Sequence, residues 1–107
     1  YLPDINQRLI MYNKISAALS LRDLKEIQLE MINRFGLFPQ ELKTLFLEAE
    51  IAIVATQYQI KGIKIINDEI TINYLNSSHD KKLNTGVDFE DNIKKIYKEL
   101  NFVSKVS

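Results

Sequence analysis

The three side-chain groups of a hydrolase triad, a hydroxyl, an imidazole and a carboxylate, occur together in the stretch Ser77-Ser78-His79-Asp80. A triad works only when its groups converge in space from positions that a scaffold holds, and neighbours in a flexible loop do not converge in that way. His79 is the only histidine of the chain. We therefore interpret this stretch as a solvated loop and not as a catalytic site.

Most other catalytic and cofactor chemistries lack the residues that they need. The chain has no cysteine, which excludes a disulfide scaffold, a thiolate zinc site and a cysteine nucleophile. Its three glycines stand far apart, so no glycine-rich phosphate cradle exists. Carboxylate pairs such as Glu48 and Glu50 lie on helix faces that we predict to be polar and solvated. We expect no enzyme, no cofactor, no metal site and no small-molecule substrate.

Composition and charge are typical of one soluble domain that spans residues 1–107, with 46% hydrophobic and 26% charged residues. The formal net charge is zero, with −1 in residues 1–54 and +1 in residues 55–107. A dedicated nucleic-acid binder usually carries a basic excess. Lys94, Lys95 and Lys98 still form a small basic face. We therefore keep an accessory domain that contacts DNA as the alternative to the function inferred below.

The chain shows no targeting or membrane segment. No apolar run approaches the roughly 20 residues that span a bilayer, and no signal peptide opens the chain. The absence of cysteine fits a reducing compartment, so we expect a cytoplasmic protein without a membrane partner. The chain begins with Tyr1 instead of Met, which indicates a piece of a longer protein.

The spacing of apolar residues predicts two helices at the start of the chain, residues 5–19 and 21–35. Ser20 and Asp23 form a capping-box-like pair for the second helix, and Gly36 supplies its left-handed C-cap. The inner stripe that we predict is Ile5, Leu9, Tyr12, Ile15 and Leu19 for the first helix, and Leu24, Ile27, Met31 and Phe35 for the second.

The third predicted helix starts at Pro39, continues to Tyr58 and is ended by Gly62. It carries two apolar stripes, so we expect it to be buried on both sides, between the first two helices and a β-hairpin. The two stripes are Leu42, Leu45, Phe46, Ala49, Ala52 and Ile53, and Leu47, Ile51, Val54 and Tyr58.

The second half of the chain predicts a hairpin and a closing helix. Residues 63–66 and 69–75 are the two strands, and residues 76–87 form a polar loop. Asp88 caps a last helix over residues 89–102. The predicted fold class is therefore α+β, with three N-terminal helices packed with a β-hairpin and a C-terminal helix.

The polar side of the second helix is the most informative surface. At 100° per residue, Glu26, Glu30 and Asn33 project together. Leu29 and Arg34 flank them, and Glu30 is placed to pair with Arg34. An apolar Leu29 in this setting fits a protein interface, and it also fits an ordinary surface with one exposed leucine.

Two segments carry a family resemblance. The first has YLPD at residues 1–4, followed by Arg8-Leu9 and Tyr12-Asn13-Lys14-Ile15, and the second reads LEMINRFGLFP at residues 29–39. At this order and spacing they resemble the C-terminal domain of the bacterial transcription-repair coupling factors (Mfd). The likeness covers residues 1–66 and continues through Leu45, Ala49, Glu50, Ile51 and the Ile60-Lys61-Gly62-Ile63 turn.

The resemblance implies a regulatory part of a larger protein. The full-length members of that family are cytoplasmic, ATP-driven DNA translocases that displace stalled RNA polymerase and recruit UvrA in transcription-coupled DNA repair. Their motor and polymerase-binding modules lie upstream. The C-terminal domain folds back on an N-terminal UvrB-like module, masks the UvrA-binding surface and holds the protein autoinhibited.

The resemblance also implies which residues meet that module. In the family a Glu, an Asp or Asn three positions later and the next Arg face it, and the matching positions here are Glu30, Asn33 and Arg34. Asn33 stands where the family more often has Asp. Together with Glu26 and Leu29 from the helix pattern, these residues form the protein interface that we predict.

Overall fold

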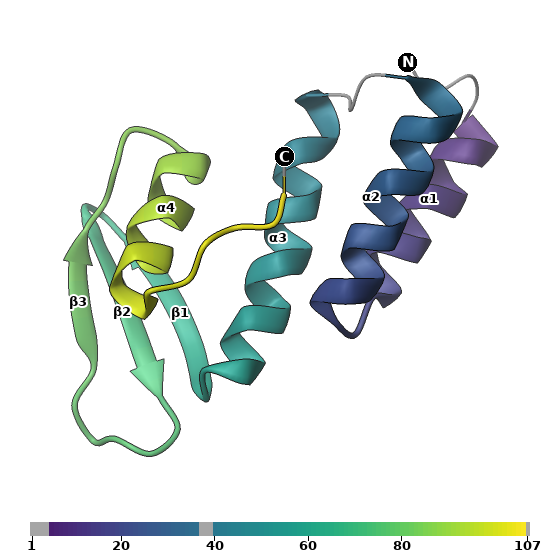
Figure 1. The fold of residues 1–107 in the computed structure, drawn as a ribbon. Helices are drawn as coiled ribbons and strands as arrows, with labels where there is room; N and C mark the ends of the chain where they lie inside the picture. The colour runs from purple at the N-terminus through teal and green to yellow at the C-terminus, as the bar shows by residue number, and fades with distance from the viewer. Residues whose placement is uncertain (1–4, 37–39, 107) are drawn as a thin grey trace. The chain divides into compact units, whose positions relative to one another are not determined.

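The computed structural model describes residues 5–36 and 40–106, and the side chains at positions 7, 8, 35, 40 and 41 lie outside the described part. The described residues form the predicted α+β fold, with helices and one antiparallel sheet (Figure 1). The chain divides into a helical unit, Tyr1–Ile53 with Lys105–Ser107, and a sheet unit, Val54–Ser104. The elements are α1 (Ile5–Ala17), α2 (Leu21–Phe35), α3 (Gln40–Gln57), β1 (Ile60–Ile66), β2 (Glu69–Tyr74), β3 (Lys81–Asn84) and α4 (Phe89–Leu100).

In the helical unit, α2 begins and ends at the predicted residues because both ends carry capping groups. The Asp23 N–H donates to Ser20 Oγ at 3.0 Å, which satisfies one amide of the first turn. At the other end, Gly36 has a φ of 84° and its N–H donates to the Ile32 carbonyl at 2.8 Å. Glycine adopts a positive φ without the steric cost that a Cβ imposes.

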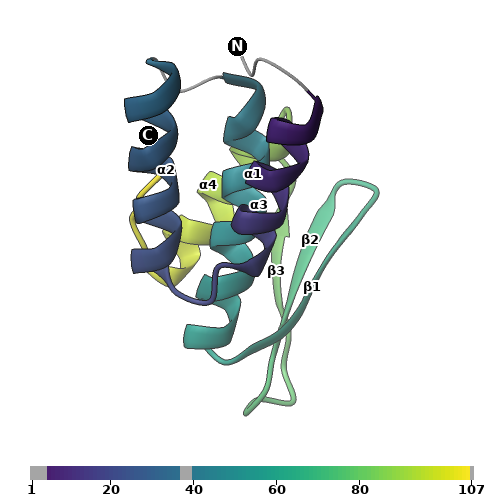
Figure 2. The ribbon, with the colours of Figure 1, turned by 90° about the vertical axis from the view of Figure 1, so that its right-hand side faces the viewer.

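One hydrophobic cluster holds the helical unit together, with α1, α2 and α3 running alongside one another (Figure 2). Met31 of α2 and Phe46 of α3 are fully buried within it. The predicted position of Phe35 in this core and the helix start at Pro39 lie outside the described residues. The buried members of the cluster are Met11, Ile15, Leu24, Met31, Leu42, Phe46 and Ile53.

The predicted inner stripe of α1 is wrong in most of its members. Ile5 and Leu9 are more than half exposed, and Leu19, which lies beyond the end of the helix, is 88% exposed. Met11, which the stripe left out, is 1% exposed, as is Ile15. Apolar residues occur around most of the circumference of α1, so spacing alone does not select the side that packs.

Both predicted apolar stripes of α3 contain buried residues, but not every member is buried, since Ala52 of the first stripe is exposed. Phe46 and Leu42 on one side and Leu47 and Val54 on the other are all at most 5% exposed. Tyr58 follows the last residue of the helix and is exposed at 37%. In the described ranges, no helix has both the length and the apolar composition to cross a membrane.

In the sheet unit, β1 and β2 form the predicted antiparallel hairpin, and Asn67 in the turn has a φ of 54°. Ile70 and Ile72 are fully buried on one face, which the alternating pattern also predicts. The prediction that Gly62 ends the third helix is wrong. Gly62 lies inside β1, next to a shift in the register of the hairpin, where a glycine suits a bulge.

The prediction of a loop over residues 76–87 is also wrong in part, because β3 lies within it and pairs antiparallel with β2. The sequence of β3, KKLN, has a single apolar residue, so it shows no alternation of its own. Leu83 pairs with Ile70, and the lysines suit an edge strand because charges oppose unwanted strand pairing. The pairing partner, not the local pattern, makes this segment a strand.

Helix α4 lies along one face of the sheet (Figure 1) and begins at the predicted residue. The Asp91 N–H donates to Asp88 Oδ1 at 2.8 Å, which confirms Asp88 as the N-cap. The helix ends before the predicted residue 102, because Asn101 adopts the left-handed conformation. Phe102 then turns back and contacts the Tyr97 ring edge-on, with 4.8 Å between the ring centroids.

Gly36→Val is expected to lower the stability of the chain by roughly 1–3 kcal/mol, because a β-branched residue resists the positive φ at this position. Thermal unfolding measures the effect. Gly62→Ala is the matched control, since its φ is ordinary and an added Cβ meets its nearest atom at 3.6 Å. Equal melting temperatures for the two variants would contradict the Gly36 cap.

Candidate interaction surface

The five predicted interface residues, Glu26, Leu29, Glu30, Asn33 and Arg34, lie on the side of α2 that faces away from the core. Leu29 is 49% exposed. Glu30 is half-buried, and the other members of the five are exposed. The opposite side of the helix buries the core residues, so the core sets which residues point outward. We refer to these five residues as the α2 face.

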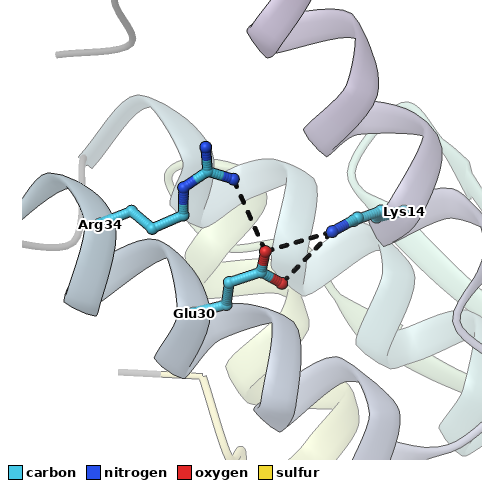
Figure 3. Close-up of polar contacts among 3 residues, drawn as sticks. All are labelled: Lys14, Glu30 and Arg34. Atoms are coloured by element: carbon cyan, nitrogen blue, oxygen red, sulfur yellow. Dashed lines mark hydrogen bonds and ion pairs between the residues drawn. The ribbon is translucent and has the colours of Figure 1, made fainter.

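Glu30 is the best-anchored member of the α2 face (Figure 3). Its carboxylate accepts from Lys14 Nζ at 3.2 and 3.4 Å, and Arg34 Nη1 lies 3.7 Å from Oε1. The Arg34 pair is the i, i+4 contact that the sequence predicts. The Lys14 contact crosses from α1 to α2, so one carboxylate receives a cation from each of two helices.

Glu26 has a partner of its own. Arg22 Nε lies 3.5 Å from Glu26 Oε1, and both side chains are mostly exposed. The repulsion between the Glu26 and Glu30 carboxylates is therefore offset by Arg22 at the first and by Lys14 and Arg34 at the second. The α2 face combines paired charges with an uncovered Leu29, which suits contact with a protein surface.

Lys14 is the member of this constellation that sequence reasoning missed. Spacing identifies partners within one helix, but the contact from Lys14 to Glu30 depends on how α1 packs on α2. A basic residue in the last turn of α1 was the available signal. The position of Lys14 in the sequence does not show which carboxylate on another helix it will contact.

The prediction for the third helix face fails at Glu50. This side chain was predicted to be solvated, and it is fully buried, whereas Glu48 is exposed as predicted. Gln28 of α2 is likewise buried, at 1% exposure. The sequence pattern did not identify these two buried residues. The spacing of apolar residues shows which side of a helix is buried, but it does not show which polar side chains are buried with a partner.

The residues of the alternative function lie on α4, in the sheet unit. Lys95 and Lys98 line an open groove between β3 and α4, with a volume of about 370 Å³. Glu99 lines the same groove and lies 3.9 Å from Lys81. A carboxylate inside the groove opposes the approach of a phosphate backbone.

The hydroxyl of Ser77 does not face the His79 imidazole in a catalytic pair. It accepts the His79 backbone N–H at 3.1 Å and lies 3.2 Å from the His79 carbonyl, so it organises a local turn. Within residues 5–36 and 40–106, the structure gathers no group of three His, Cys, Asp or Glu residues that could hold a metal ion.

Comparison with known proteins identifies related sequences. The TRCF domain family matches residues 1–85, which extends beyond the predicted resemblance over residues 1–66 and includes β3. The transcription-repair-coupling factor of Escherichia coli (strain K12) is 41% identical over 64 residues, 60% of this chain and 5% of that protein.

Two further relatives carry the same description. That of Bacillus subtilis (strain 168) is 33% identical over 72 residues, 67% of this chain and 6% of the relative. That of Buchnera aphidicola subsp. Baizongia pistaciae is 29% identical over 101 residues, 94% of this chain and 14% of the relative. The matched part of the chain thus spans a small fraction of each curated relative.

A double-mutant cycle of Lys14→Met and Glu30→Gln is expected to give a coupling energy of about 0.2–1 kcal/mol, because both side chains are substantially exposed. The coupling should shrink in 1 M salt, which screens exposed charges. Chemical denaturation of the four proteins measures it. The matching cycle of Arg22→Gln and Glu26→Gln, at the more exposed pair, should give a smaller value, and a larger one would contradict this ranking.

Proposed function

This chain belongs to the TRCF domain family, and from that premise we propose that it is the C-terminal regulatory domain of a bacterial transcription-repair coupling factor. In this proposal the domain performs no catalysis itself. It folds back on the N-terminal UvrB-like module of its parent, masks the UvrA-binding surface and keeps the ATP-dependent DNA translocase autoinhibited. RNA polymerase and DNA are then contacted by other modules of the parent, in the cytoplasm.

The observation that carries this proposal is the α2 face. It presents the half-exposed Leu29 among three charged side chains, Glu26, Glu30 and Arg34, all of which form ion pairs. A charged rim around an apolar contact gives register and specificity more than affinity. That balance suits a contact that must open when the parent protein is activated.

The cross-helix pair of Lys14 and Glu30 adds a reason for specificity. Because Lys14 holds the Glu30 carboxylate from α1, the carboxylate is already oriented before any partner arrives. An oriented group loses less side-chain entropy on binding than a mobile one. The domain therefore offers a fixed acceptor, with Arg34 beside it, to complementary groups on the UvrB-like module.

A weak contact is sufficient when both partners belong to one chain. A covalent linker commonly supplies an effective concentration near millimolar, so the intramolecular clasp closes even at modest affinity. The same contact between separate fragments lacks this advantage. We therefore expect poor binding between the isolated domain and the isolated N-terminal module.

In the full-length parent, the double variant Leu29→Asp/Asn33→Lys is expected to raise UvrA affinity by roughly tenfold, since it removes an apolar contact and reverses the local charge pattern. Both side chains are exposed in the described structure, so the melting temperature of the isolated chain should hardly change. Titration of UvrA against the full-length wild type and variant measures the release of the mask.

Two further proteins control this experiment. Thr44→Lys adds a charge to an exposed position of α3 outside the α2 face and should leave UvrA affinity unchanged. Lys14→Glu/Glu30→Lys reverses the cross-helix pair while retaining opposite charges, so it should keep the fold and, by replacing the Glu30 acceptor, raise UvrA affinity as the first variant does. If the Leu29→Asp/Asn33→Lys protein binds UvrA no better than the wild type while it remains folded, the clasp does not use the α2 face.

The alternative of a DNA-contacting domain makes a different prediction. With zero net charge and Glu99 inside the Lys95 and Lys98 groove, the isolated chain should bind duplex DNA no better than weakly at physiological salt. Lys95→Glu/Lys98→Glu should leave that weak binding unchanged. Micromolar affinity with a steep salt dependence, lost in this variant, would establish the alternative.

A further inference from the structure

A second feature of α2 lies on the side opposite the α2 face. A narrow cleft there is formed by Leu21, Leu24, Lys25 and Gln28 of α2 and by Glu50 of α3, and Lys105 and Val106 close it so that no room for a water molecule is left. All these residues belong to the helical unit. The C-terminal segment reaches this unit beside α2 and α3 (Figures 1 and 2).

The cleft holds both main-chain polar groups of a single residue. The Lys105 N–H donates to Glu50 Oε2 at 2.7 Å, and Lys25 Nζ donates to the Lys105 carbonyl at 3.3 Å. The next side chain, Val106, packs against the hydrophobic cluster of the helical unit. An acceptor, a donor and an apolar site in succession recognise an extended segment through its backbone.

The acceptor of the Lys105 amide is the buried carboxylate of Glu50. Glu50 is fully buried, and a buried carboxylate is costly unless hydrogen bonds replace the water that it loses. A hydrogen bond to an ionised acceptor is also stronger than one between neutral groups. The Lys105 amide therefore contributes to satisfying a carboxylate that the core cannot leave bare.

Gln28 shows that the bound segment satisfies the cleft incompletely. Its side chain is 1% exposed and lines the same cleft, and Nε2 has no hydrogen-bond partner among the described residues. A buried donor without an acceptor opposes the closed state. The closed state thus combines two favourable main-chain contacts with one unfavourable group.

We propose that this cleft is a binding site for an extended peptide segment and that its ligand is the chain's own residues 105–106, which act as a latch that opens reversibly. The chain leaves the helical unit after Ile53 and returns to it at Lys105, so the closed latch ties residues 54–104 at both ends. Opening it leaves the covalent connection through α3. The conformational entropy lost on loop closure disfavours the closed latch. The unpaired Gln28 amide disfavours it as well, so the latch can open.

Hydrogen exchange of the Lys105 amide in the full chain reports the latch directly, since this amide is protected only while it bonds Glu50. Exchange slower than in an unstructured peptide of the same sequence is expected for the wild type. Gln28→Leu removes the unpaired donor and should slow exchange by roughly tenfold. Glu50→Gln weakens the acceptor and should accelerate it by a similar factor.

Glu48→Gln is the matched control, because it makes the same chemical change at an exposed position of α3. It should leave exchange at Lys105 unchanged. The exchange of amides within α2 reports whether the helical unit is folded. If Glu50→Gln does not fold, Lys25→Met replaces it, because this variant removes the donor to the Lys105 carbonyl and leaves the buried carboxylate intact. An unprotected Lys105 amide in the wild type, or equal exchange in wild type and Gln28→Leu, would overturn the proposal.

Discussion

The rotation of α2 about its own axis is the constraint on which the helical unit depends. Burial of Leu24 and Met31 in the cluster shared with α1 and α3 fixes that rotation. Since successive residues turn by 100°, every other position of the helix is then assigned to a side. The α2 face is directed to solvent, Glu30 is brought to Lys14, and Gln28 is placed in the cleft that holds the C-terminal segment.

The charges of the helical unit contribute little to its stability. Lys14, Glu30 and Arg34 are all substantially exposed, and ion pairs in water contribute little to folding. Their positions are nevertheless defined, because Lys14 and Glu30 sit on two helices that the hydrophobic cluster holds in contact. Apolar burial thus provides the free energy of folding, and the ion pairs set the charge pattern that the α2 face presents.

Local signals predicted the parts of the fold that local chemistry determines. The bounds of α2 follow from the Ser20 cap and Gly36, and the Asp88 cap starts α4. The side of α1 that packs, the strand β3 and the burial of Glu50 depend on partners distant in sequence. Helix periodicity likewise predicted that the five residues share one side of α2 and that Glu30 contacts Arg34, but it could not predict the contact with Lys14 on another helix.

Two surfaces with different demands share α2 without competing. The α2 face is a charged surface directed outward, whereas the cleft contacts main chain through Lys25 and the buried Glu50. The cluster between them holds the helix from several directions, and packed interiors resist small rotations. Opening the latch therefore does not by itself turn the α2 face away from a partner. Coupling between the two would require α2 to move as a whole, which means breaking the burial of Met31.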